Sequence, residues 1–316
     1  MGIAILSGIL ADLQKPKPFQ PFSSNSGTST PVETVPIPNR LPSRFIACVR
    51  RPESSKKVKD ALRKIDPSLF DARKIVKVVQ NDNINACKEA EVVLLGCKPY
   101  MVDEILQSPG MREALEGKLL ISICAGVPVS QMETALYGES VFDSKNSSQK
   151  CTIVRAMPNT ASGIRESMTV IATSTPALQA EASAIIEWIF ERIGKVVHLP
   201  PSTMDASTAL CGSGPAFFAL MLEASIDGAV AMGLPRAEAL KMAAQTMKGT
   251  AAMVLEGEHP ALLRDKVTTP GGCTIGGLLV LEEGRVRGTV ARAVREATVV
   301  ASQLGKGVQG VNGTRF

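Results

Sequence analysis

The chain has 316 residues, of which 45% are hydrophobic, and a formal net charge of +5. This composition can supply two hydrophobic cores, and it shows no apolar run long enough for a membrane span and no signal or transit peptide, so we expect a soluble cytoplasmic protein. The mild charge, without Lys and Arg blocks between aromatic residues, argues against nucleic-acid binding.

The first two thirds of the chain alternate between helical and strand patterns. Residues 2–14 have a helical pattern, and residues 15–43 are rich in Pro, Ser and Thr and are predicted to be a disordered insertion. Short apolar runs then alternate with helical stretches. These runs are RFIACVR, KIVKVV, EVVLLGC, KLLISIC, CTIVRAM, SMTVIAT and KVVHL. The alternation predicts βαβ units and a mostly parallel sheet.

From Ser202 onwards the sequence predicts only helices. A long apolar helix is expected first, interrupted at Gly212-Ser213-Gly214-Pro215, where the proline should kink it or end one segment. A second helix is expected to restart with Pro235 in its first turn. Further helices are expected in HPALLRDKV, IGGLLVLEEG and RVRGTVARAVREATVVASQLG. Because these helices are apolar nearly all round, they are predicted to pack against a second subunit.

Cysteine and histidine usage argues against most metal and nucleophile chemistry. The seven cysteines have no Cys-x-x-Cys spacing and lie mostly in apolar strings, as reduced core thiols do. Only His198 and His259 are present, so a metal cage or a Ser-His-Asp triad has almost nothing to be built from. We therefore expect chemistry that depends on a cofactor.

Basic residues follow the first predicted strand. RFIACVRR ends in Arg50 and Arg51 at the start of a helix. In a dinucleotide-binding fold, the end of the second strand meets the adenosine ribose, where an acidic residue selects NAD and basic residues accept the 2′-phosphate of NADP. No acidic residue stands there, so the arginines are candidates for NADP binding. The alternative for these arginines is a solvated basic helix start. Residues 1–8, taken alone, indicate only an N-terminal helix.

Small or polar residues follow three other predicted strands. Residues 96–100 read GCKPY and residues 122–128 read SICAGVP. Ligands bind at the carboxyl ends of parallel strands, and small side chains let a cofactor come close. Residues 155–160 (RAMPNT) place a charged and an amide side chain at the same edge. Ordinary strand-to-helix turns, with Asn159 as a cap, are the alternative.

The strongest local signal is VTTPGGCT, residues 267–274, which opens a helix. Two adjacent glycines let successive backbone N–H groups point into one concavity at a helix N-terminus, where a carboxylate or phosphate can bind. Thr274 can either cap that helix or present its hydroxyl to a ligand.

Together these residues resemble the pyrroline-5-carboxylate reductase family over essentially the whole chain. HPALLRDKVTTPGGCTIGGLLVLE resembles the family signature, and VRAMPNT, CGSGPAFF, GLPR and GCKP fall in the family's order and spacing. The long insertion is similar to that of fungal members. The resemblance implies a Rossmann-like doubly wound parallel sheet followed by an all-α dimerisation domain. It implies an NADP-binding domain at 1–200, a helical substrate and dimerisation domain at 201–305, and a disordered tail at 306–316.

The resemblance also implies a cofactor, NADPH with NADH as the alternative, and a set of site residues. Expected cofactor-binding residues are Gly2, Arg50, Arg51, Asn83, Gly96, Cys97, Lys98, Pro99, Cys124, Ala125 and Gly126. Lys98, Ala125 and Gly126, with Pro99, would line the nicotinamide side and Asn83 the adenosine side. Expected substrate-binding residues are Thr269, Gly271, Gly272, Cys273 and Thr274, and no metal is expected.

One part of the family pattern does not match. Members normally open with a strand and a Gly-x-Gly-x-Met-Gly turn before the segment that reads here as IAILSGIL, whereas this sequence starts at that Met and keeps only Gly2. The strand would be the central one of the sheet, so its neighbours would lose a shared ladder, and the pyrophosphate would lose its glycine turn. We therefore expect the chain as written to bind NADPH weakly and to fold less completely.

The implied reaction passes a hydride from NADPH to the C=N carbon of L-1-pyrroline-5-carboxylate and gives L-proline, the last step of proline biosynthesis. An iminium is already electrophilic, so the protein mainly needs to position two ligands and hydrogen-bond the ring nitrogen. Thr274 is the catalytic candidate for that hydrogen bond. The expected partners are this small molecule and further copies of the chain, with no nucleic acid and no membrane.

Two alternatives remain at this stage. One is another NADP-dependent dehydrogenase of the same two-domain plan, such as one acting on a β-hydroxy acid. Such enzymes use a Lys and an Asn in the helical domain, and the lysines available here, Lys241 and Lys248, resemble solvated helix positions. The other is a non-catalytic homologue that keeps the helical domain as an interaction module.

Overall fold

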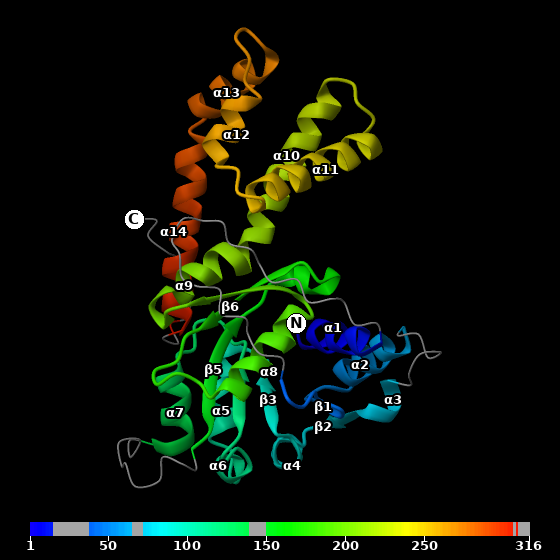
Figure 1. Cartoon of the computed structure of the whole chain (residues 1–316), viewed down its shortest axis with the longest axis vertical. Helices are drawn as coiled ribbons and strands as arrows, with labels where there is room; N and C mark the ends of the chain where they lie inside the picture. Colours follow the sequence, from blue (N-terminus) through cyan, green and yellow to red (C-terminus); the bar gives the residue numbers. More distant parts are fainter. Residues whose placement is uncertain (15–37, 65–71, 139–149, 306–307, 309–316) are drawn as a thin grey trace. The chain divides into compact units, whose positions relative to one another are not determined.

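The alternating apolar runs form strands connected by helices (Figure 1). The computed structural model describes residues 1–14, 38–64, 72–138, 150–305 and 308. Most of the predicted insertion at 15–43 and of the predicted tail at 306–316 therefore lies outside the described residues. The chain divides into a first unit (1–19, 35–212 and 297–316) and a second unit (20–34 and 213–296).

The first unit contains all of the described strands. They are β1 (Phe45–Val49), β2 (Val76–Gln80), β3 (Val92–Leu95), β4 (Leu119–Ser122), β5 (Thr152–Met157), β6 (Ser167–Ala172) and β7 (Gly194–Leu199). Its helices are α1 (Gly2–Gln14), α2 (Pro52–Arg63), α3 (Ala72–Ile75), α4 (Asn83–Glu89), α5 (Val102–Leu106), α6 (Met111–Ala114), α7 (Val129–Tyr137), α8 (Ala180–Glu191) and α9 (Met204–Ser207), with the short turns η1 (Pro99–Met101), η4 (Thr160–Ile164) and η5 (Pro201–Thr203).

The strands form two sheets. β1 and β2 pair in parallel as one sheet, and the second has the order β3-β4-β5-β6-β7. Among the described residues no strand joins β1 to β3, which is where the family pattern places the strand that does not match here. The predicted Rossmann-like fold is confirmed, with this division. One pairing departs from the parallel pattern, because β5 and β6 are antiparallel. The connection from Pro158 to Glu166 is too short for a parallel crossover.

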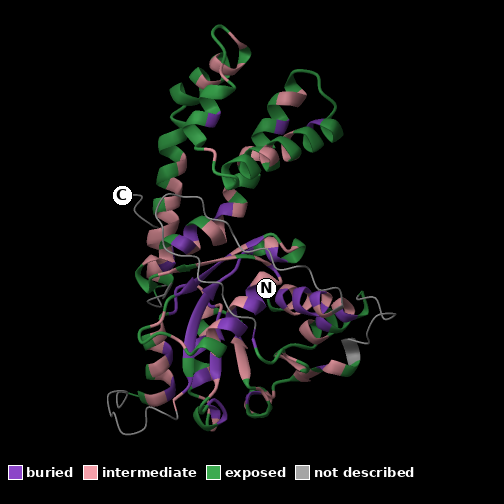
Figure 2. Ribbon diagram, in the orientation of Figure 1, coloured by how far each residue is buried: buried purple, intermediate pink, exposed green. Residues whose placement is uncertain are grey.

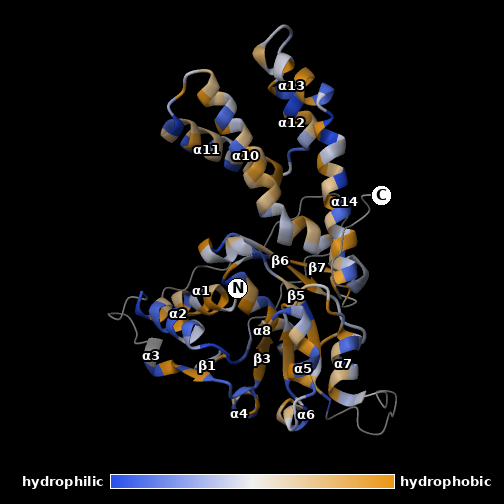
Figure 3. Cartoon of the chain, turned by 180° about the vertical axis from the view of Figure 1, so that it is seen from behind, coloured by the Kyte–Doolittle hydropathy of each residue, from blue (hydrophilic) through white to orange (hydrophobic). Residues whose placement is uncertain are grey.

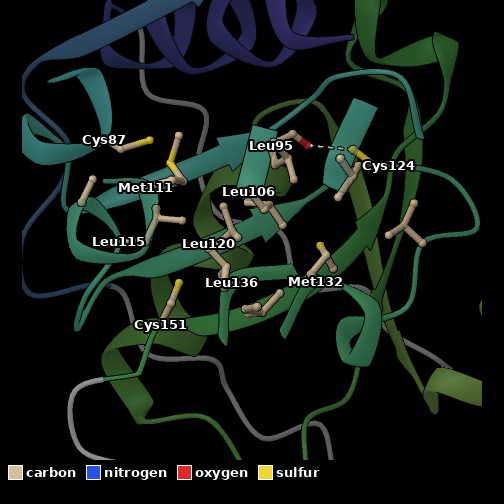
Figure 4. Packing of buried hydrophobic residues seen from close by; sticks show 14 residues of the cluster. Cys87, Leu95, Leu106, Met111, Leu115, Leu120, Cys124, Met132, Leu136 and Cys151 are labelled. Atoms are coloured by element: carbon tan, nitrogen blue, oxygen red, sulfur yellow. Dashed lines mark hydrogen bonds between the residues drawn. The ribbon is translucent and has the colours of Figure 1, made fainter. Parts of the chain in front are cut away.

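Two core clusters cover opposite faces of the five-stranded sheet. Successive residues of a strand point to opposite faces, so Leu120 of β4 packs with α5, α6 and α7, while Ile121 packs with α1 and α8. Figure 4 shows the first cluster, with Leu106, Leu120 and Met132 side by side. In Figure 3, β3 and β5 are orange along most of their length, as expected for strands covered on both faces.

Helix α1 packs on both sheets. Its Ile5 and Ile9 belong to the cluster under α8, whereas its Leu10 packs against Val58 of α2 and Val76 of β2. At the end of α8, Arg192 Nη1 donates to Asp12 Oδ2 of α1 at 2.7 Å, and both side chains are about nine-tenths buried. This helix therefore connects the two-stranded sheet to the five-stranded one.

The second unit is helical, as predicted. It contains α10 (Gly214–Ala231), α11 (Arg236–Leu255), α12 (Pro260–Lys266), α13 (Cys273–Glu283) and the start of α14 (Val286–Gly305). The predicted interruption is a π-helical turn at Thr208–Ser213, after which Pro215 lies in the first turn of α10, where its missing N–H costs no hydrogen bond. Pro235 is the N-cap of α11, one residue before the predicted position.

The apolar helices of the second unit remain largely uncovered. Figure 2 shows α10, α11 and α13 mostly as exposed residues. Large apolar side chains are exposed there, among them Phe218, Leu220, Leu240, Met242, Leu279 and Val280.

One described helical run is long and apolar enough to cross a membrane. It is Pro201–Ala231, in which an 18-residue segment has a mean hydropathy of 1.4 and 17% of that segment is buried. The expectation that the sequence contains no such run is therefore wrong. A single run is a weak indication, because helices of soluble proteins pass the same test.

Candidate functional site

The carboxyl ends of β1 and β2 bring together three predicted cofactor residues. Arg50 and Arg51 follow β1 and are exposed, and Asn83 is the first residue of α4 after β2. The Cys48 thiol donates to Asn83 Oδ1 at 3.0 Å, and Gln80 Nε2 donates to the Arg50 carbonyl at 3.2 Å. Two cations and an amide therefore meet at one edge, an arrangement that suits a phosphate beside a ribose.

The carboxyl ends of β3 and β4 bring together the predicted nicotinamide residues. Leu95 lies opposite Ser122 in the parallel register, so GCKP and CAG extend from neighbouring strand ends. Gly126 is buried with a φ of +75°, a conformation that disfavours side chains. An added Cβ at Gly96 would touch the Ile123 side chain at 3.4 Å. Lys98 is exposed and precedes Pro99, which begins η1. This edge is lined by small residues next to one exposed lysine.

Two thiols meet at this edge. The sulfur atoms of Cys97 and Cys124 are 3.9 Å apart. The hydrogen bond between them raises the pKa of Cys97, with burial adding to the effect, and lowers the pKa of Cys124 against the opposing effect of burial. The two thiols are therefore coupled, so that ionisation of one disfavours ionisation of the other.

The N-terminus of α1 lies at the same edge as the end of β5. The Ser162 hydroxyl of η4, which follows β5, lies 3.2 Å from Met1 Sδ and donates to the Asn159 carbonyl at 2.7 Å. Gly2 is exposed, and a Cβ added to it would meet nothing within 4 Å. The free N–H groups and positive dipole end of a 13-residue helix are thus directed to the edge where a pyrophosphate is expected.

Arg155 of β5 begins the RAMPNT segment that was expected at this edge, although no role toward a ligand was assigned to it. It is 6% exposed, its Nη2 has no hydrogen-bond partner among the described residues, and burial lowers its pKa, with Asp205 opposing this effect. An unsatisfied buried guanidinium is unusual. The available signal was a charge inside the apolar run CTIVRAM. Nearby, Asn159 is a cap, because its Oδ1 accepts from the Ala161 N–H at 3.0 Å.

The predicted anion loop lies in the second unit. Gly271 has a φ of +64°, and Gly272 is the N-cap of α13. A Cβ at Gly272 would lie 2.5 Å from Thr269 Oγ1, so the turn requires glycine. No side chain caps α13, and the partly exposed Thr274 hydroxyl has no hydrogen bond within the part of the chain that the structure describes. The N–H groups of Cys273 and Thr274, at the first turn, therefore remain available to an anion.

Both histidines make contacts near them in the fold, and the two lysines considered for a β-hydroxy acid dehydrogenase are exposed to solvent. His198 Nε2 lies 2.6 Å from Glu187 Oε2, and His259 Nδ1 accepts from the Ala261 N–H at the start of α12. Lys241 and Lys248 are exposed on α11. No cluster of three or more His, Cys, Asp or Glu that could hold a metal occurs in the described ranges.

Two family models match the chain. Residues 201–304 match a model described as pyrroline-5-carboxylate reductase dimerisation, and residues 38–126 match one described as NADP oxidoreductase, coenzyme F420-dependent. The first covers the helices beyond β7, and the second covers the segment from before β1 to Gly126.

Full-length relatives are similar over the whole chain. A pyrroline-5-carboxylate reductase of Lophium arboricola is 66% identical, with 100% of this chain and 94% of the relative covered. One of Neurospora crassa is 56% identical over 100% of this chain and 93% of the relative. Among solved structures, the Plasmodium falciparum pyrroline carboxylate reductase with NADP bound has a TM-score of 0.67 and 25% identity over 84% of this chain and all of that one. The Coxiella burnetii enzyme has a TM-score of 0.66 and 27% identity over 84% of this chain and 99% of that one.

Proposed function

This chain belongs to the pyrroline-5-carboxylate reductase family. We propose how the strand-end residues of the first unit and the loop before α13 carry out the reduction of L-1-pyrroline-5-carboxylate to L-proline. The cofactor is NADP in its reduced form. The observation that carries the proposal is the glycine turn before α13, which leaves the Cys273 and Thr274 N–H groups and the Thr274 hydroxyl without partners among the described residues.

The residues of the first unit fit a dinucleotide. Arg50 and Arg51 would hold the 2′-phosphate, Asn83 the adenosine side, and the N-terminus of α1 the pyrophosphate. Small residues leave room for a flat ring at the ends of β3 and β4, where Gly126 has a backbone conformation that few side chains allow. When bound, NADPH supplies the hydride that the C=N carbon accepts.

The loop before α13 would hold the substrate. Its carboxylate accepts hydrogen bonds from the N–H groups of Cys273 and Thr274, and the helix dipole adds to this attraction. The Gly272 N–H already donates to the Thr269 carbonyl at 3.1 Å. The Thr274 hydroxyl hydrogen-bonds the ring nitrogen, which fixes the C=N bond in one orientation. The proton that the nitrogen gains comes from solvent or through this hydroxyl, so no histidine is needed.

Replacement of Thr274 by Val tests this assignment. The variant removes the hydroxyl but keeps the shape, so we expect kcat to fall about 10- to 100-fold, the equivalent of one hydrogen bond to a charged group. NADPH affinity should stay nearly unchanged because Thr274 is not among the residues assigned to the cofactor. Thr274→Ser, which keeps the hydroxyl, should retain most of the activity. Unchanged turnover in Thr274→Val would remove Thr274 from the mechanism.

We further propose that the second unit joins copies of the chain into a homo-oligomer. The exposed apolar residues of α10, α11 and α13 support this proposal, as does the match of this region to a dimerisation model. Light scattering during size-exclusion chromatography tests it with Leu279→Glu, which places a charge on the exposed α13 face. A mass that falls towards one chain is expected, and an unchanged oligomer would place the contact elsewhere.

A cytoplasmic location is also proposed, on weaker support. All seven cysteines are free thiols, which is typical of a reducing compartment. Fractionation of cells that express the tagged chain tests this location, and recovery with membranes would contradict it. The comparisons lend no support to a β-hydroxy acid dehydrogenase or to a non-catalytic homologue.

A further inference from the structure

Cys97 and Cys124 occupy matching positions on neighbouring parallel strand ends. The register pairs Leu95 with Ser122, and the Ile123 N–H donates to the Leu95 carbonyl at 3.0 Å, so the pairing continues past the ends of β3 and β4. Two residues beyond Leu95 and Ser122, the same register places Cys97 beside Cys124. Neighbouring strands lie about 4.8 Å apart, within the roughly 4.4–6.8 Å between Cα atoms that a disulfide spans.

The two sulfur atoms already face each other. Their separation is 3.9 Å, and both side chains pack on the same core cluster. Cys124 is 3% exposed and also lies 3.5 Å from the Leu95 carbonyl, the contact dashed in Figure 4. Cys97 is partly exposed, so a small oxidant can reach the pair from its side.

We propose that Cys97 and Cys124 form a reversible disulfide that switches off the cofactor edge. This proposal rests on the proposed function, because the two thiols lie within the GCKP and CAG turns assigned to the nicotinamide. The sulfur atoms must move from 3.9 Å to bonding distance, which draws the two turns together. Gly96 and Lys98 flank one sulfur and Ala125 the other, so the small-residue surface that receives the cofactor changes shape.

The oxidant is a hydroperoxide, with hydrogen peroxide as the simplest case. A thiolate attacks one peroxide oxygen, the O–O bond breaks, and the sulfur becomes a sulfenic acid as water is released. The second thiol attacks this sulfur, the S–O bond breaks, and the hydroxyl leaves with the thiol proton as water. In total, two thiols lose two electrons to the peroxide and give one disulfide and two waters.

The pairing of the two thiols favours this reaction over oxidation of an isolated buried cysteine. Cys151 is 7% exposed, and burial raises its pKa to about 12, so little thiolate forms there near neutral pH. At the pair, the neighbouring thiol supplies a hydrogen bond to a thiolate and also the second sulfur that completes the disulfide. Cys273 is the exposed thiol that competes for the same oxidant.

The test treats the full chain with hydrogen peroxide and measures three quantities. Mass spectrometry of non-reduced digests follows a peptide that links Cys97 to Cys124. NADPH titration and pyrroline-5-carboxylate-dependent turnover are each compared with the same sample after dithiothreitol. We expect the linked peptide to appear while NADPH affinity and turnover each fall at least tenfold, and we expect dithiothreitol to restore both.

Three variants isolate the pair. Cys97→Ser and Cys124→Ser should form no linked peptide and show no dithiothreitol-reversible loss relative to their own reduced forms. Cys273→Ser removes only the competing exposed thiol and should still form the linked peptide. The absence of linkage at a peroxide dose that oxidises Cys273 would overturn the proposal, as would linkage with undiminished NADPH affinity. The linked peptide is detected without any assay of turnover, so a failure of the reductase assignment is recognised separately.

Discussion

The two sheets of the first unit are built from similar apolar runs but differ in burial. Every residue of β1 is partly exposed, whereas all four residues of β4 are buried. β4 lies between two strands with helices on both faces, while β1 pairs with β2 on one edge only. The burial of β1 and β4 therefore depends on their neighbouring strands more than on the amino-acid composition of each strand.

The expected cofactor-binding residues are also divided between the two sheets. Arg50, Arg51 and Asn83 lie on the two-stranded sheet, and the GCKP and CAG turns lie on the five-stranded sheet. Helix α1 connects the two through apolar contacts and the Asp12–Arg192 ion pair. Helix α4 also links them, because Cys87 packs in the core cluster of the five-stranded sheet while Asn83 accepts from the Cys48 thiol of β1. Correct spacing of the adenosine and nicotinamide ends of the cofactor therefore depends on these two helices.

Loss of the α1 contact with the two-stranded sheet should have the largest effect. Leu10 is fully buried against Val58, Leu62 and Val76, so Leu10→Ala should lower the free energy of unfolding by about 3 kcal/mol. Hydrogen exchange should accelerate first in β1 and β2, because these strands lose their main apolar cover.

Ile9→Ala is the matched control for that experiment. Ile9 precedes Leu10 on α1 but packs on the five-stranded sheet, so its loss should expose amides around α8 and β5 before those of β1. If both variants opened the same amides first, the two sheets would form one cooperative unit, and the contrast between them would have no energetic consequence.

Supplying a central strand should have the next largest effect. A strand and a Gly-x-Gly turn joined ahead of Met1 would pair with β1 and β3 along the edges where the described residues supply no neighbouring strand. It would also add backbone N–H groups for a pyrophosphate. Hydrogen bonds to a charged group contribute about 1.5–3 kcal/mol, so NADPH affinity should rise at least tenfold. Calorimetric titration of both chains measures this change, and equal, tight, stoichiometric binding to the original chain would refute it.

The smallest expected effect is on the preference for NADPH over NADH, to which side chains on the two sheets should contribute differently. Arg51→Ala removes a cation expected at the 2′-phosphate, so NADPH affinity should fall several-fold to about tenfold while NADH affinity changes little. Gly126→Ala strains a φ of +75° on the nicotinamide side and should weaken both cofactors alike. Fluorescence titrations with NADPH and NADH compare the variants. Equal losses of both cofactors in Arg51→Ala would move the 2′-phosphate away from β1.

Much of this arrangement could be predicted from local sequence. Alternation of apolar and helical runs predicts βαβ units and a mostly parallel sheet. The glycine pair in TTPGGCT predicts a helix start with uncapped N–H groups, as Gly272 and α13 have. These features depend on neighbouring residues. Arg50 and Arg51 were proposed for NADP from their place after a predicted strand, whereas the assignment of Asn83 came from the family resemblance, and these assignments remain predictions.

Features set by distant pairing could not be predicted. The Asp12–Arg192 ion pair and the Cys97–Cys124 contact depend on helix packing and strand register, neither of which is written in a local run. The unsatisfied Arg155 gave a signal, a charge within an apolar strand, but its burial became evident only in the folded chain. The membrane-length run at 201–231 was missed because the Gly-Ser-Gly-Pro interruption suggested two shorter segments.

The most direct measurement is pyrroline-5-carboxylate-dependent NADPH oxidation, with L-proline as the detected product, in this chain and in the chain extended by a strand and glycine turn. We expect L-proline from the extended chain, at a rate well above that of the chain as written, with loss of turnover in Thr274→Val. No L-proline from either chain would contradict the assignment of the site.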